Sequence, residues 1–464
     1  MVVCSGKKIL VMVSYFYKLK LCKKLSKMKK ILSFLTPLLL FVSVAAGQAV
    51  RFNVSESPRV TLLAVDCLLI IFSIIFFSYL LSTKNLIDYL KKIWKCLPWR
   101  ILIIFLVWAV ISLAINSAAY SSGQILNAFS YWARLSILVF NVTVMFYLLK
   151  ERIIETAKFL ENFLIWSAVI LVFGYLQLIF VPDFSFMALF GWDPHQGRML
   201  STFFDPNYLG AFLVLLLSVL LGVGLGSSNR KLKNILIAFF ILSWIALYFT
   251  YSRSAWAQGA IALPLVAYRK NWKLALGVLA IFIIMVFVPT RLGSRIAQSG
   301  SIFQSSSTST TQDSDFDPSA AARGESLKRG LKLATNHWLY GVGYNAYGTA
   351  LTNSGLSKDK SLTGMSSQGS DSSLLNIFAT TGIVGLVLFL SFFTSLGFKL
   401  FLKFKEKKDW LAWSLLSFLV AWIAGSFFNN TLLYILILLP FLVLISTALA
   451  DNKPNQSNDY PKDK

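Results

Sequence analysis

Residues 209–225 read LGAFLVLLLSVLLGVGL, and residues 432–449 read LLYILILLPFLVLISTAL. A helix that crosses the hydrocarbon core of a bilayer needs about 20 mostly apolar residues, and each run approaches this length. Neither run alternates apolar with polar residues, as the strands of a membrane β-barrel do. A helix also satisfies its own backbone hydrogen bonds inside lipid. These runs therefore predict an all-α polytopic integral membrane protein.

The composition of the 464-residue chain agrees with this class. Hydrophobic residues make up 56% of the chain and charged residues 14%, whereas soluble domains carry about 25% charged residues. The net charge of +24 does not indicate nucleic-acid binding, because the positive charge is divided among short segments between apolar runs. We therefore expect a lipid bilayer and no nucleic acid as a partner. The four cysteines and two histidines are scattered and predict neither a disulfide framework nor a metal site.

Twelve apolar ranges predict the membrane helices. A longer polar segment, residues 290–372, separates the ninth range from the tenth. The ranges are 31–48, 60–81, 101–119, 131–149, 160–182, 207–226, 235–252, 254–268, 274–289, 373–396, 409–427 and 431–450.

The basic residues predict the orientation of the chain. With the N-terminus inside, the inner segments hold 31 of the 44 Lys and Arg residues, and only five of the others lie outside the long loop. By the positive-inside rule, both termini are then cytoplasmic and the loop is external. Met28 is an alternative start to Met1. The chain divides into a basic N-terminus (1–30), nine helices (31–289), the loop (290–372), three helices (373–450) and a tail (451–464).

The long loop has two parts. Residues 298–322 are rich in Ser, Thr and Asp, which predicts a flexible segment. Residues 323–347 carry Leu327, Leu331 and Ala334 at helical spacing, which predicts an amphipathic helix on the outer face of the membrane. A glycine-rich turn, Gly341-Val342-Gly343, ends this stretch.

Three external arginines are candidates for binding a phosphate or diphosphate, because the guanidinium group offers a planar fork of donors that matches phosphate oxygens. Arg198 precedes the helix start Asp205-Pro206-Asn207, which is itself typical of a helix cap. Arg253 lies in a tight turn between two apolar ranges, where the alternative is an interfacial anchor beside Trp256 and Tyr251. Arg323 begins the amphipathic stretch, where the alternative is a solvated surface charge.

Asp371, at the start of the tenth range, is a candidate general base for a hydroxyl proton. The alternative is an ordinary N-cap, which the helix dipole favours. Glu325 is a rival carboxylate in the loop. His337 precedes the glycine-rich turn, and a lone histidine is more often structural than functional.

Four segments in this order resemble the O-antigen ligase and polymerase family of bacterial envelope enzymes. The resemblance covers the motifs of residues 195–395 and the helix layout of the whole chain. The segments are RMLSTFFDPNYLG (198–210), YSRSAW (251–256), RGESLKRGLKLATNHWLYGVGYNAY (323–347) and DSSLLNIFATTGIVGLVLFL (371–390).

The resemblance implies a metal-independent glycosyltransferase with a glycosyltransferase C-like membrane fold and no cofactor. Its donor would be a glycan on undecaprenyl diphosphate, and its acceptor a glycan, a lipid or a protein. Ligases and polymerases of the family share this donor, so both remain open. The resemblance places the protein in the bacterial cytoplasmic membrane, with other envelope glycan assembly proteins as candidate partners.

The resemblance also implies roles for single residues. Arg198, Arg253 and Arg323 fall where the family has arginines that hold the diphosphate leaving group. The family often has a histidine eleven residues before the glycine of a GxxG pattern, and counting back from Gly382 gives Asp371 instead. With Asp371 as the base, a single displacement would invert the anomeric centre. The implied substrate-binding residues are Asn207, Glu325, His337, Gly341 and Gly343.

A transporter or flippase for a solute or a lipid-linked sugar is the alternative function. Twelve helices suit it, but the ranges after residue 160 hold few ionisable residues at mid-depth, where a transport site is expected. The candidate charges lie at the outer ends of the ranges instead.

Overall fold

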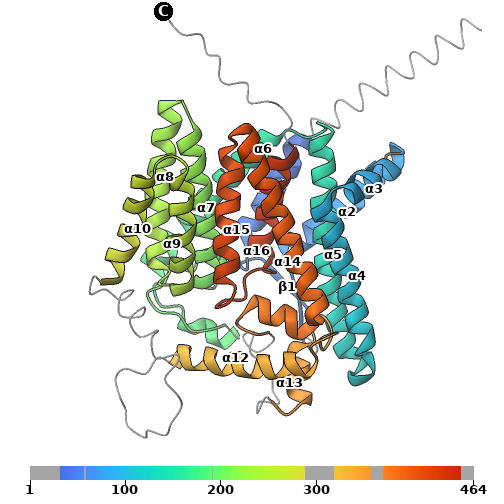
Figure 1. Cartoon of the computed structure of the whole chain (residues 1–464). Coiled ribbons are helices and arrows are strands. Elements are labelled where there is room, and N and C mark those ends of the chain that lie inside the picture. Colours follow the sequence, from blue (N-terminus) through green and yellow to red (C-terminus); the bar gives the residue numbers. More distant parts are fainter. Residues whose placement is uncertain (1–31, 57–58, 191, 288–317, 357–368, 451–464) are drawn as a thin grey trace, which may run out of the picture.

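The structure is a computed structural model that describes residues 32–56, 59–190, 192–287, 318–356 and 369–450. The predicted basic N-terminus, the cytoplasmic tail and residues 298–317 of the flexible segment lie outside these residues. The described part is a bundle of helices that stand mostly side by side, with α12 lying across one end (Figure 1).

After a first apolar helix, Leu32–Ala46, the chain forms one short hairpin and a series of helices. The hairpin strands are β1 (Arg51–Glu56) and β2 (Arg59–Leu63), which pair antiparallel. The α-helices are α2 (Ala64–Ser82), α3 (Leu86–Lys95), α4 (Leu97–Ile115), α5 (Ser122–Lys150), α6 (Thr156–Phe180), α7 (Pro206–Gly226), α8 (Arg230–Phe249), α9 (Arg253–Tyr268), α10 (Trp272–Phe287), α12 (Pro318–Asn336), α13 (Tyr347–Asn353), α14 (Ser373–Lys407), α15 (Trp410–Gly425) and α16 (Ile435–Ala450).

Seven of the described helices are long and apolar enough to cross a membrane, namely α2, α4, α5, α6, α7, α8 and α14. The first helix, α10, α15 and α16 are apolar but shorter, and α9 has 16 residues. Each of the twelve predicted ranges overlaps one of these helices. The protein is therefore a mostly helical, multi-pass membrane protein, while the number of twelve crossings stays a prediction.

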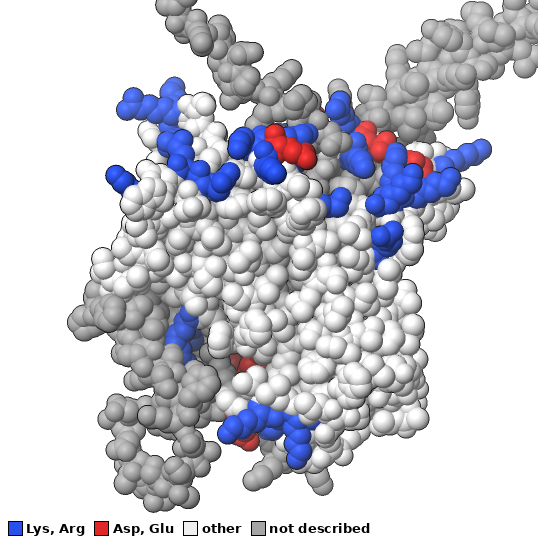
Figure 2. Space-filling view, viewed as in Figure 1, with Lys and Arg blue, Asp and Glu red and all other residues white. Residues whose placement is uncertain are grey.

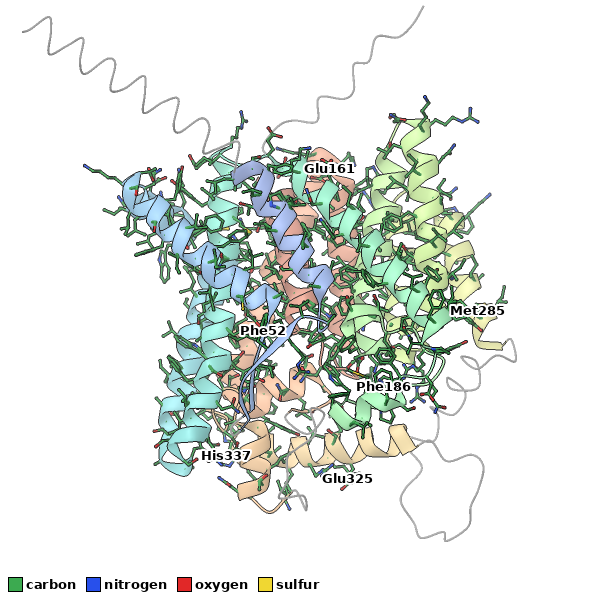
Figure 3. The ribbon with its side chains drawn as sticks, turned by 180° about the vertical axis from the view of Figure 1, so that it is seen from behind. Phe52, Glu161, Phe186, Met285, Glu325 and His337 are labelled. Carbon is green, nitrogen blue, oxygen red and sulfur yellow. The ribbon has the colours of Figure 1, made fainter. Side chains whose placement is uncertain are left out.

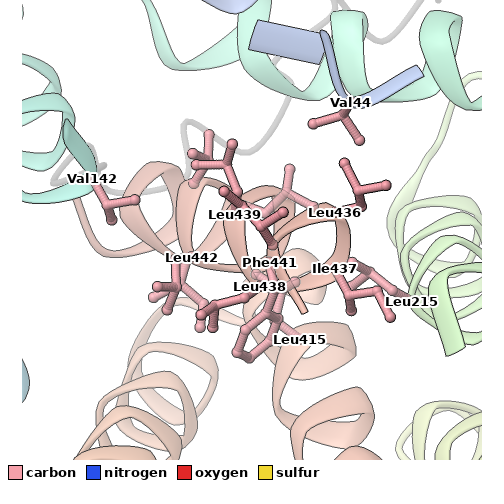
Figure 4. Packing of buried hydrophobic residues seen from close by; sticks show 14 of the residues in the cluster. Val44, Val142, Leu215, Leu415, Leu436, Ile437, Leu438, Leu439, Phe441 and Leu442 are labelled. Atoms are coloured by element: carbon pink, nitrogen blue, oxygen red, sulfur yellow. The ribbon is translucent and has the colours of Figure 1, made fainter. Parts of the chain in front are cut away.

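Helix α16 lies at the centre of the bundle. Nearly all of its side chains are buried, as expected for a helix that is apolar on every side. Figure 4 shows Leu436, Ile437 and Phe441 among buried side chains that include Leu215 of α7 and Leu415 of α15. This core fixes helices from both halves of the chain against one another.

Charged side chains are distributed unevenly along the bundle. Figure 2 shows Lys and Arg gathered at the upper end and a wide uncharged band below it. A smaller basic group lies at the lower end, where α12 crosses the bundle. The positive-inside rule would place the upper end in the cytoplasm, and this orientation stays a prediction.

The hairpin contradicts the all-α prediction in one place. Residues 60–63 belong to strand β2, and α2 begins only at Ala64. The N–H group of Leu63 donates to Oδ2 of Asp66 (2.8 Å), which caps α2 directly after the strand. In the sequence, Phe52 and Val54 alternate with polar neighbours, which is a strand signal. The apolar run that follows obscured it.

The predicted helix of the long loop is present as α12. It begins at Pro318, five residues before the predicted amphipathic stretch, so residues 318–322 are helical rather than flexible. Ala334 is buried, whereas Leu327 and Leu331 stay largely exposed. Exposed apolar side chains on a crosswise helix suit contact with a bilayer surface.

Candidate functional site

Hydrogen bonds join the N-termini of α7, α9 and α14. Ser252, the N-cap of α9, donates to Oδ1 of Asn207 in the first turn of α7 (2.8 Å), and its Oγ lies 3.2 Å from Oγ of Ser254. The Asn429 amide donates to Ser254 Oγ (3.3 Å), and Ser373, the first residue of α14, donates to the Asn429 carbonyl (3.1 Å). Helix N-termini carry partial positive charge, so three of them together favour an anionic ligand.

The Asp205-Pro206-Asn207 segment is a helix cap. Oδ1 of Asp205 accepts hydrogen bonds from the N–H groups of Asn207 (2.6 Å) and Tyr208 (3.1 Å), and Pro206 is the first residue of α7. The capping interpretation is therefore confirmed. Asn207 has a further role, because its side chain also contacts the cap of α9.

Arg198 holds the segment before α7 against the turn between α8 and α9. Its side chain is only 7% exposed. Nε donates to the carbonyl of Thr250 (2.8 Å), and Nη2 lies 3.5 Å from the carbonyl of Tyr251. Both carbonyls directly precede the cap of α9, so the structure brings Arg198 to the segment that carries Arg253. Part of its guanidinium group is engaged by backbone, a structural role that the sequence did not predict.

Arg253 is the first residue of α9 and is half-buried. The alternative role as an interfacial anchor relied on Trp256 and Tyr251, which would then face the lipid headgroups. Tyr251 is half-buried. Trp256 is instead buried at 3% exposure and packs edge-on against Trp244 and Phe282. The anchor interpretation is therefore wrong for this tryptophan, while the position of Arg253 at a helix N-terminus suits anion binding.

The candidates in α12 lie at the same end of the molecule as His337 (Figure 3). Glu325 is exposed, and its Oε1 lies 3.9 Å from Nε of Arg329, one helical turn away. The backbone of Arg323 lies in α12, but its side chain is outside the described part of the structure. His337 is exposed, and its carbonyl accepts a hydrogen bond from the N–H of Gly341 (2.8 Å).

Asp371 lies immediately before α14 but does not cap it. Ser372 is the N-cap, and its Oγ accepts a hydrogen bond from the N–H of Leu375 (3.3 Å). The N-cap interpretation of Asp371 is therefore wrong, because the hydroxyl one residue later takes that role. Asp371 is half-buried. Burial raises the pKa of the Tyr347 hydroxyl, Ser370 and Arg329 act to lower this pKa, and the negative charge of Asp371 acts to raise it.

The glycine-rich turn fills a break in α14. Gly382 interrupts that helix with a φ of 67°, which frees backbone groups inside the apolar region. The N–H of Val342 donates to Ala379 O (2.9 Å), that of Gly343 to Thr380 O (3.0 Å), and that of Ile383 to Trp338 O (2.7 Å). The turn thus supplies hydrogen-bond partners for the backbone groups that the break in α14 leaves unpaired.

A cavity of about 300 Å³ lies beside the starts of α7 and α14. Of the described residues that line it, none was among the candidates from the sequence. Its lining includes Arg51 of β1, Arg134 of α5, Tyr208 of α7, Asn376 of α14, and Asn430 and Tyr434 before α16. One signal could have found it: Arg134 lies inside a predicted membrane helix, where an ionisable residue indicates a functional site by default.

Gly369 and Ser370 lie close to two residues that line this cavity. The N–H of Ser370 donates to Oδ1 of Asn376 (3.3 Å), and a side chain at Gly369 would approach Nδ2 of Asn430 to 3.1 Å. Both amides line the cavity. Asp371 therefore follows a segment that rests on the cavity wall.

Comparison with known families gives one match. Residues 238–390 match the family described as O-antigen ligase. The matched region runs from within α8 to within α14, and it includes Arg253, the whole long loop and Asp371. The family resemblance predicted from the sequence is confirmed for residues 238–390, and the segment at residues 198–210 lies outside the match. No curated protein matches the chain.

Proposed function

We propose that this protein, with its O-antigen ligase region, is a glycosyltransferase that takes its glycan from undecaprenyl diphosphate. The family match and the apolar helices indicate a multi-pass membrane protein of the O-antigen ligase type. We further propose a lipid-linked donor, a glycan, lipid or protein acceptor, and a site on the outer face of the bacterial cytoplasmic membrane with both termini inside. Other envelope glycan assembly proteins are proposed partners.

The meeting of three helix N-termini beside two arginines carries this proposal. Arg198 is fixed to the turn before α9, Arg253 begins α9, and the cap of α9 is joined to α7 and α14. Partial positive charge from the helix ends adds to the guanidinium charges. Such a site stabilises a diphosphate as negative charge develops on it, which is the main electrostatic requirement for this leaving group.

The proposed reaction is a single displacement at the anomeric carbon. The acceptor hydroxyl loses its proton to Asp371 and forms the new carbon–oxygen bond, while the bond from the anomeric carbon to the phosphate oxygen breaks. The electron pair of that bond leaves with the undecaprenyl diphosphate, which Arg198, Arg253 and Arg323 would hold. The displacement inverts the anomeric centre and involves no metal or nucleotide in the proposal.

Asp371 is a better proposed base than Glu325. It is half-buried beside a cavity wall, whereas Glu325 is exposed on α12 and lies close to Arg329. A base must reach the hydroxyl that it deprotonates, and partial enclosure favours proton transfer over exchange with water. We propose that Glu325, His337 and Asn207 contribute to substrate binding, and that the turn at Gly341 and Gly343 shapes the acceptor side.

A transporter remains the second candidate because α14 is broken at Gly382. Discontinuous membrane helices are typical of transporter binding sites, where freed backbone groups meet a substrate. Here the turn at residues 338–343 takes up those groups instead. This observation favours the enzyme.

The test is glycan transfer by the purified full-length protein in proteoliposomes that contain a lipid-linked glycan and an acceptor. We expect Arg253→Ala to reduce transfer by about 100-fold or more, in line with the loss of one group that stabilises a developing charge. Arg230→Ala is the matched control, because Arg230 is exposed at the N-terminus of α8, at the opposite end of that helix from the α8–α9 turn. Wild-type transfer by the Arg253 variant would exclude its proposed role.

Two further results would separate the alternatives. Movement of labelled lipid-linked glycan across the bilayer without a transferred product would support the transporter. In cells, deletion followed by glycan profiling would separate the two enzyme types, because loss of chain length indicates a polymerase and unattached full-length polymer indicates a ligase.

A further inference from the structure

The charged side chains that line the cavity beside α7 and α14 are all positive. Among the described lining residues are two arginines, Arg51 and Arg134, and no carboxylate. Three helix starts contribute to the same wall through Tyr208 of α7, Asn376 of α14 and Ile435 of α16. Positive side chains and positive helix ends around one cavity make it attractive to an anion.

Arg134 is held in a fixed orientation by a buried carboxylate. Nε of Arg134 donates to Oδ1 of Asp66 (2.6 Å), and Nη2 donates to Oδ2. Asp66 is itself 4% exposed and does not line the cavity. A guanidinium group has five N–H donors, and this paired contact uses only Nε and one edge of Nη2. Its remaining donors are therefore pre-organised for a ligand in the cavity that Arg134 lines.

Arg51 enters the cavity from the hairpin. Its guanidinium carbon lies 5.3 Å from the centre of the Trp192 ring, a cation–π contact that restricts the side chain. The carboxylate of Asp205, at the start of α7, accepts two backbone hydrogen bonds. Gly369 and Ser370, which precede Asp371, lie close to Asn376 of the cavity lining. The described residues that line the cavity carry two positive charges and no negative charge.

The remaining polar groups suit a sugar. Asn376, Asn430 and Gln48 offer both donors and acceptors, which hydroxyl groups need, and Tyr434 accepts a hydrogen bond from Nε2 of Gln48 (3.0 Å). The rings of Tyr208 and Tyr434 stack 4.0 Å apart and 9° from parallel, which gives a flat apolar surface. A volume of about 300 Å³ is at the lower end of small-molecule sites, which fits one or two sugar rings.

We propose that this cavity binds an acidic sugar unit of the transferred glycan. The sugar carboxylate is held by Arg51 and Arg134, and its hydroxyls by Asn376 and Asn430. The inference rests on the proposed function, because it assumes that the substrate is a glycan, and it names that substrate as one that carries a carboxylate. Binding beside the 369–371 segment would bring the sugar near Asp371.

The test measures binding separately from transfer. The purified full-length protein is titrated, by ligand-observed NMR, with methyl glucuronide and methyl galacturonide, and with the matched neutral glucoside and galactoside. We expect at least one uronide to bind tenfold or more tightly than its neutral match, with a preference that weakens as salt increases. Arg51→Gln is expected to remove the preference, and Arg51→Lys to retain part of it.

Matched controls keep the outcome clear. Arg230→Gln, at the N-terminus of α8, is expected to leave the preference unchanged, and the midpoint of thermal unfolding shows whether Arg51→Gln still folds. Equal or absent binding of acidic and neutral sugars would overturn the inference. So would competition for the uronide site by polyprenyl diphosphate without a glycan, because the arginines would then hold the carrier. If either of these two results is obtained and glycan transfer still proceeds, the proposed function stands. If the protein prefers the uronide but transfers no glycan, the proposed function is overturned instead.

Discussion

The hydroxyl of Ser252 donates a hydrogen bond to Oδ1 of Asn207, 2.8 Å away, and so joins the first turns of α9 and α7. We expect Asn207→Ala to lower the free energy of unfolding by about 1 kcal/mol, the usual contribution of one such bond. Transfer should fall further than stability, because Arg253 directly follows Ser252. Asn207→Asp keeps the acceptor oxygen and should restore stability, but its negative charge at the proposed anion site should keep transfer low. Equal transfer by all three proteins would show that this contact does not position the site.

Removing Asp66 from its pair with Arg134 is expected to lower the stability of the protein strongly. Asp66→Ala removes the acceptor of Arg134 and of the Leu63 N–H group, and it leaves a partly buried cation. The expected cost is about 3–5 kcal/mol. Replacing both residues, as in Asp66→Ala with Arg134→Met, should cost less than Asp66→Ala alone because no unpaired charge remains. Thermal unfolding in one detergent measures both, and a double variant less stable than the single one would contradict this account.

Much of the helical layout could be predicted from the sequence because hydropathy is a local property. Every predicted apolar range overlaps a helix, and the cap at Asp205 and the turn at Gly341 follow from local chemistry. The strand at residues 60–63 was missed because the apolar run of α2 follows it without a break.

The candidate site was predicted only in part, because it depends on contacts between distant segments. Arg51, Arg134 and Asn376 meet in one cavity although more than 80 residues separate each from the next. Asp66 and Arg134 each lie within an apolar range, and only the fold shows that they form a pair. Likewise, both Asp371 and Ser372 are good N-cap residues by type, so only the geometry could assign the cap to Ser372.

Gly382 and Gly277 provide a matched pair for the broken helix. A Cβ at Gly382 would lie 2.1 Å from the carbonyl oxygen of Leu339, and the residue has a φ of +67°. We expect Gly382→Ala to destabilise the protein by several kcal/mol, because backbone strain and a backbone collision add together. A Cβ at Gly277 in α10 meets nothing within 4 Å, so Gly277→Ala should be neutral or slightly stabilising. Similar unfolding midpoints for the two variants would contradict the assigned packing of the turn against α14.

Asp371 and Ser372 are adjacent, but Asp371 is the proposed base and Ser372 caps α14. Variants of the two residues should therefore have different effects. Asp371→Asn should reduce transfer by about 100-fold or more, the typical effect of a lost general base. The cap of α14 should be kept in this variant, since Ser372 supplies it. Ser372→Ala should instead lose about 1 kcal/mol of stability and retain most of its transfer activity. The two measurements are the initial rate of transfer and thermal unfolding on the same preparations. If Asp371→Asn transferred glycan at the wild-type rate, another group would have to accept the acceptor proton, and exposed His337 and Glu325 would be the next residues to replace.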